Sequence, residues 1–119
     1  MTDKTDDKER ILRENVQEYL SSAEQAIQNT KYNVAVTLFF KALCASADLF
    51  LYLKTKQVPS SHSNRFAILK KNYAEIYELL DKDFPFYQDS YTKKMSKEAA
   101  EVLRDDARTI AQSTEKLQK

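Results

Sequence analysis

The chain contains no glycine and no tryptophan, and it has only two prolines among its 119 residues. Proteins rich in β-hairpins use glycine in turns that need a positive φ, so the lack of glycine favours a helical protein. It also excludes the glycine-rich loops that cradle nucleotide phosphates. The net charge is only +1, and the overall charge therefore does not favour binding to nucleic acid or to an anionic membrane.

Cysteine and histidine are equally scarce, with one residue of each. Cys44 cannot form an intramolecular disulfide, and its position in an apolar stretch predicts a buried core residue in a reducing compartment, which we expect to be the cytoplasm. With His62 alone, no catalytic triad and no zinc motif can be built. We therefore predict no catalytic residue, no metal site and no cofactor. The charged N-terminal segment lacks the apolar region of a signal peptide.

What is present is helical periodicity, with apolar residues recurring every three or four positions. The pattern predicts helices over about residues 7–29, 31–56 and 63–81, a short helix over 85–92, and a last helix capped by Ser96. Residues 84–94 are rich in aromatic side chains and are called the aromatic connector below, and Pro85 is expected to prevent one continuous helix through them. We predict an all-α fold, an antiparallel up-down bundle of four to five helices around a long central helix. It forms a single domain over residues 1–119, with residues 1–7 disordered.

The central helix is apolar on nearly every face and is about as long as a membrane span. Within it, Lys41 and Asp48 would each cost about 2.5–3.5 kcal/mol near the centre of a bilayer, so we expect no membrane insertion. Together with Thr37 they form one narrow stripe, which is expected to face solvent or an interface. Burying the remaining apolar faces is expected to require a second subunit, which predicts a homodimer.

Two segments carry candidate ligand-binding residues. His62 and Arg65 begin the third helix, where free amide groups attract anions; the alternative is that His62 only fixes the turn after Pro59. Tyr87, Tyr91 and Lys93 belong to the aromatic connector, where rings can stack on bases and lysines can bind phosphates. The alternative there is that the rings close one end of the bundle or form a dimer interface.

The order of several short motifs resembles the HEPN family (higher eukaryotes and prokaryotes nucleotide-binding domains). The resemblance covers about residues 9–113. It rests on Lys31-Tyr32-Asn33-x-Ala35-x-x-x-Phe39-Phe40-Lys41-Ala42, Pro59-x-x-His62, a connector ending in Ser90-Tyr91, and Ser96-x-Glu98-x-Ala100.

The HEPN resemblance implies a helical bundle that dimerises through its long helices and is close in fold to the substrate-binding domains of minimal nucleotidyltransferases. Some members are ribonucleases of toxin–antitoxin systems that use an Arg and a following His separated by four to six residues. The corresponding positions before His62 are Thr55, Lys56 and Gln57, so that motif is absent.

We therefore expect a non-catalytic HEPN-like module that binds a nucleotide, RNA or a nucleotidyltransferase subunit, in a toxin–antitoxin type of system. Two alternatives remain open. One is a metal-independent ribonuclease with an unusual site built from His62, Arg65 and Tyr91. The other is a structural adaptor that docks through its aromatic connector.

Overall fold

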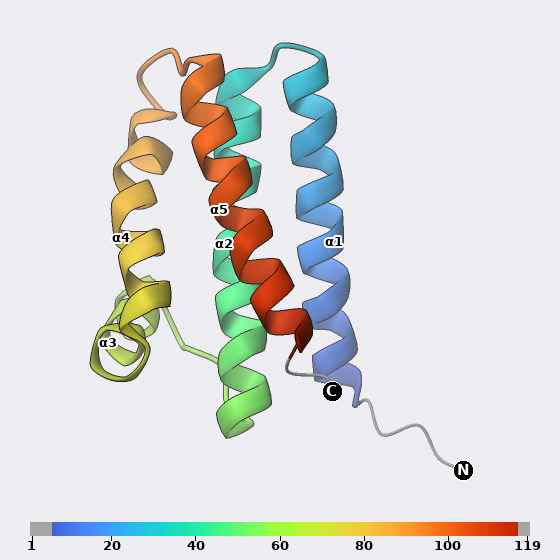
Figure 1. The fold of residues 1–119 in the computed structure, drawn as a ribbon, viewed down its shortest axis with the longest axis vertical. Coiled ribbons are helices and arrows are strands. Elements are labelled where there is room, and N and C mark those ends of the chain that lie inside the picture. Colours follow the sequence, from blue (N-terminus) through green and yellow to red (C-terminus); the bar gives the residue numbers. More distant parts are fainter. Residues whose placement is uncertain (1–5, 117–119) are drawn as a thin grey trace.

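The computed structural model describes residues 6–116, which form five α-helices and, within that range, no β-strand (Figure 1). Helices α1, α2, α4 and α5 run alternately up and down, while α3 lies across the lower end of the bundle (Figure 1). The predicted all-α antiparallel bundle is confirmed. The helices are α1 (Asp7–Gln28), α2 (Tyr32–Thr55), α3 (His62–Asn72), α4 (Ala74–Asp89) and α5 (Lys97–Lys116).

Helix α2 is the centre of the core and contacts α1, α4 and α5. Among the described helices it alone is long and apolar enough to cross a membrane, but 61% of its apolar window is buried inside the bundle, as in the core helix of a folded domain. The predicted polar stripe is confirmed, because Lys41 is exposed and Thr37 and Asp48 are partly exposed. Since neighbouring helices cover α2 within one copy, its apolar composition does not by itself require a second subunit. The homodimer stays a prediction.

The predicted helix over residues 63–81 is wrong, because the chain breaks at Tyr73. Tyr73 has φ −141° and ψ 68°, outside the helical region, and it separates α3 from α4. Its ring packs edge-on against Phe50 of α2, with ring centroids 4.9 Å apart. The bend lets Leu69 and Leu80 both reach the core.

The predicted break at Pro85 is also wrong, since α4 continues through it to Asp89. A proline inside a helix removes the hydrogen bond to the carbonyl four residues earlier, here that of Asp81. Both Pro85 and Asp81 are exposed, so this carbonyl is on the solvent side of the helix and water can satisfy it. On the opposite side, Phe84 and Tyr87 pack on Phe40 of α2 and hold the helix together.

The helix starts follow local capping chemistry. Ser96 accepts a hydrogen bond from the Ala99 amide at 3.0 Å, which confirms it as the cap of α5. Asp6 accepts one from the Glu9 amide at 2.7 Å and another from the Tyr52 hydroxyl at 2.6 Å. The predicted disorder of residues 1–7 is therefore wrong for Asp6 and Asp7, and residues 1–5 lie outside the described range.

Asn33 joins the two turns at the upper end of the bundle, where the α1–α2 turn lies beside the α4–α5 connector (Figure 1). Its amide group donates to the carbonyls of Ser90 at 2.9 Å and Lys93 at 2.7 Å. Its carbonyl oxygen accepts from the Met95 amide at 2.8 Å. One side chain thus satisfies three backbone groups of the connector.

Replacing Asn33 with Ala is expected to lower the free energy of unfolding by about 1–3 kcal/mol, because the connector loses partners for three polar groups. Urea unfolding followed by circular dichroism measures this loss. Asn72→Ala is the matched control, since the Asn72 amide makes only an exposed 3.3 Å hydrogen bond within its own helix. Equal stability losses in the two variants would contradict the role given to Asn33.

Candidate functional site

A groove of about 240 Å³ lies between α1, α2, the start of α3 and the end of α4. We call it the His62 groove. It opens on the side of α2 that carries the polar stripe. Its lining residues come from four helices and are Leu12, Asn15, Tyr19, Phe40, Lys41, Cys44, Ala45, Asp48, His62, Arg65 and Tyr87.

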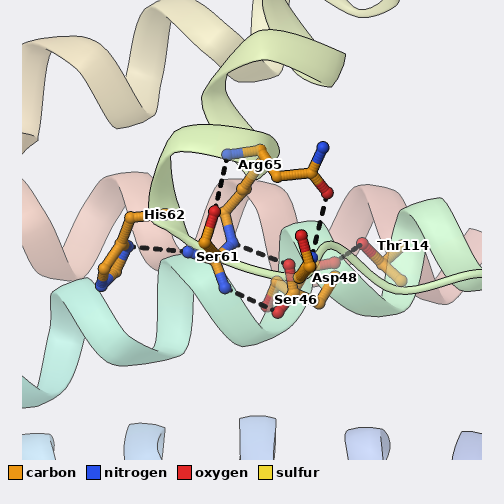
Figure 2. Close-up of polar contacts among 8 residues, drawn as sticks. Ser46, Asp48, Ser61, His62, Arg65 and Thr114 are labelled. Atoms are coloured by element: carbon orange, nitrogen blue, oxygen red, sulfur yellow. Dashed lines mark hydrogen bonds and ion pairs between the residues drawn. The ribbon is translucent and has the colours of Figure 1, made fainter.

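Arg65 and Asp48 form a two-point ion pair on one wall of the groove (Figure 2). The Arg65 Nε and Nη2 atoms lie 2.8 Å and 2.9 Å from the two carboxylate oxygens. The side chains are only 12% and 17% exposed, so solvent screens this pair weakly. Burial is the largest single influence on the pKa of Arg65 and would lower it, but the hydrogen bonds to Asp48 and the charge interactions with Cys44 and Asp48 together raise that pKa. The charge of Arg65 is thus permanently paired.

His62 is fixed at the first position of α3, where Ser61 caps the helix by accepting a hydrogen bond from the Asn64 amide at 3.0 Å. The His62 Nδ1 atom lies 2.8 Å from Arg65 Nη1 (Figure 2). A guanidinium can only donate, so Nδ1 must accept and the ring carries its proton on Nε2. Desolvation, followed by the charges of Arg65 and Lys41, lowers the pKa of His62 below its ordinary value. The ring is therefore neutral at neutral pH.

Lys41 supplies the unpaired positive charge of the groove. It is exposed, and within residues 6–116 its ammonium forms no ion pair; it lies 6.0 Å from the centre of the Tyr87 ring. Since Asp48 balances Arg65 and His62 is neutral, the groove has a net charge of one positive unit at neutral pH. Such a groove attracts a single anionic group.

Tyr87 forms the aromatic wall. It is 9% exposed and stacks on Phe40, with centroids 4.7 Å apart. Its hydroxyl is 2.9 Å from that of Tyr91, which is 71% exposed. The hydrogen bond with Tyr91, together with desolvation, raises the pKa of Tyr87 to about 12. Only one of the two hydroxyls donates within the pair, so the other keeps an O–H for a ligand.

Among the described residues, the groove contains neither an activated nucleophile nor a set of metal ligands. Cys44 is 7% exposed, and burial raises the pKa of its thiol to about 12, so the thiolate is not formed at neutral pH. The predicted burial of this residue is confirmed. Across residues 6–116, no group of three or more His, Cys, Asp or Glu side chains could hold a metal ion.

The structure brings together most of the residues singled out from the sequence. His62, Arg65 and Tyr87 line the same groove, and Tyr91 joins it through Tyr87. Lys93 does not reach it; its ammonium instead lies 3.6 Å from Asp89.

Lys41 and Asp48 were not singled out as ligand-binding residues, although the polar stripe on the central helix had marked both. Asn15 and Tyr19 of α1 also line the groove. The sequence does not mark them as binding residues, because the apolar residues of α1 recur every three or four positions, as on any helix that packs in a core.

A comparison of the chain with protein-family models, with curated proteins and with solved structures found no match in any of the three.

Proposed function

We propose that this chain is a non-catalytic, HEPN-like helical module that binds a nucleotide or RNA in the His62 groove. The observation that carries the proposal is the convergence of an unpaired cation, a histidine and an aromatic wall from three helices on one groove. Lys41 would bind the phosphate, Tyr87 and Tyr91 would hydrogen-bond or stack against the base or sugar, and His62 would donate from Nε2.

The Arg65–Asp48 pair has a supporting role in this proposal. It fixes the tautomer of His62 and holds α3 on α2, while its own charge is balanced. The HEPN resemblance adds two partners: a second copy of the chain and a nucleotidyltransferase subunit. The polar stripe, of which Lys41 and Asp48 line the groove, is the surface on which either partner would complete the ligand site. Co-purification with the tagged chain and sedimentation analysis test these partners separately from the ligand.

Lys41→Ala is expected to weaken binding of AMP or a short RNA by roughly tenfold or more, because the groove loses its unpaired cation. Isothermal calorimetry measures the change, and the affinity of the unaltered chain should fall as salt is added. Lys93→Ala is the matched control, because Lys93 lies outside the groove and should leave affinity unchanged. If neither ligand bound, or if the two variants behaved alike, the proposed site would be wrong.

One observation keeps a ribonuclease as the second candidate. His62 lines the groove with its Nε2–H directed to no acceptor within residues 6–116, so it can donate a hydrogen bond to a scissile phosphate, and it can act as a base only where Nδ1 is released from Arg65. Incubating the purified chain with RNA tests this activity directly. His62→Ala should abolish any cleavage that is found, whereas cleavage that survives the substitution belongs to a contaminant.

A further inference from the structure

Asp83 is the most unusual charged residue of the bundle. It belongs to α4, is 0% exposed, and neither of its carboxylate oxygens has a hydrogen-bond partner. It shares the ammonium of Lys82, which lies within 4.0 Å of both carboxylates, with Asp106 of α5, a second carboxylate that is only 15% exposed. Buried polar groups in native proteins are almost always hydrogen-bonded, so this arrangement needs an explanation.

The surrounding charges do not balance two carboxylates. Lys82 of α4 places its ammonium 2.9 Å from Asp106 and 4.0 Å from Asp83. Helices α2 and α3, which also pack on α4, contribute no charged residue among their buried ones, and α5 contributes Asp106 itself. Two ionised carboxylates beside one ammonium would leave a negative charge buried without compensation. A single proton removes this charge and turns Asp83 into a donor to Asp106, as in other close carboxyl pairs.

We propose that Asp83 and Asp106 share one proton, and that this carboxyl pair is a pH-sensitive latch that holds α4 against α5 and so keeps the aromatic wall of the His62 groove in place. Asp83 adjoins Phe84 and lies one helical turn before Tyr87, so loosening α4 at Asp83 displaces both rings. The effect of the latch on ligand binding rests on the proposed function of the groove. The existence of the latch does not depend on that function.

The sign of the pH dependence follows from the folded-state pKa. Burial first, and then the neighbouring Asp106, raise the pKa of Asp83 from its usual 3.8 to about 8. Between these values the folded chain binds more protons than the unfolded chain, so stability falls as pH rises. The latch is closed when Asp83 is protonated, and it opens as the pH passes through about 8.

The carboxyl pair can be observed directly by following the ¹³C carboxyl shifts of aspartate in the full chain against pH. We expect a titration that involves Asp83 and Asp106 with a midpoint near 8. Asp106→Asn should move this midpoint to lower pH, because the like charge is gone and the new amide can donate to Asp83. Titration of both residues near 4, the range of ordinary carboxyls, would overturn the proposal.

Hydrogen exchange of the α4 amides between about pH 7 and 9, corrected for intrinsic rates, tests the mechanical consequence. Protection should fall across this range in the unaltered chain and stay constant in Asp83→Asn. Asp105→Asn is the matched control, because Asp105 is 68% exposed and pairs with its neighbour Arg104, so its variant should behave as the unaltered chain does. If Asp83→Asn lost protection with pH as the unaltered chain does, the latch would be wrong.

AMP binding measured in the same pH range tests the link to the groove. The thiol of Cys44 and the hydroxyl of Tyr87, with pKa values of about 12, do not titrate there, and neither does His62. The second ionisation of phosphate, near pH ~6, also lies outside the range. We expect affinity to fall about fivefold or more in the unaltered chain and to stay constant in Asp83→Asn. If AMP did not bind at any pH, the proposed function would be contradicted but the latch would not. The carboxyl titration and the hydrogen-exchange data test the latch without a ligand.

Discussion

Replacing Phe40 with Ala is expected to lower the free energy of unfolding by about 3–5 kcal/mol, the largest loss of any substitution considered for this chain. Phe40 is 1% exposed. Its ring lies 4.7 Å from that of Tyr87 and 5.7 Å from that of Phe84, so it is the main aromatic contact between α2 and α4. Truncation leaves a cavity between α2 and α4, and the surrounding helices can close it only in part.

Urea unfolding measures this loss, and two control variants identify its cause. Phe40→Leu keeps most of the volume and should cost less than about 1.5 kcal/mol. Val34→Ala, at a position of the same helix that is 47% exposed, should change stability by about 0.5 kcal/mol or less. A loss in Phe40→Ala as small as that in Val34→Ala would show that the contact between α2 and α4 contributes little. Because Tyr87 rests on Phe40, AMP affinity should fall in parallel with stability.

Replacing Asp48 with Asn should lower stability and raise anion affinity in the same variant. Arg65 would keep its buried position and lose its partner charge, which costs about 2–3 kcal/mol for a pair with this degree of exposure. The same change frees the guanidinium and gives the His62 groove a second unpaired cation. Affinity for phosphate or AMP should therefore rise several-fold, about what one additional charge-assisted hydrogen bond provides.

Chemical unfolding and calorimetric titration of Asp48→Asn measure the two effects independently. Asp89→Asn is the matched control, because Asp89 pairs with Lys93 at 3.6 Å outside the groove and both side chains are well exposed. That variant should lose at most about 1 kcal/mol and bind as before. Affinity that fell in Asp48→Asn would mean that Asp48 contacts the ligand itself and does not only neutralise Arg65.

In α3 and α4 the tertiary structure departs from what the local sequence predicts. The periodicity of residues 63–81 identified the apolar face correctly but joined two helices into one. Nothing near Tyr73 marks a break, since the sequence there has neither glycine nor proline. At the break Tyr73 packs against Phe50, a residue of another helix that is remote in the sequence. At Pro85 the local signal was strong, and packing against Phe40 together with an exposed Asp81 carbonyl outweighed it.

The sequence by itself determined the all-α class, the ends of α1 and α2, the Ser96 cap and the polar stripe of the central helix. These features depend on residues within a few positions of one another, where helical period and capping act directly. Only the tertiary structure decided which faces meet. It brought Lys41 beside His62 and Tyr87, paired Arg65 with Asp48, and set Asp83 against Asp106. Such contacts join residues far apart in the chain, and their energies depend on the packing of whole helices, which no local pattern encodes.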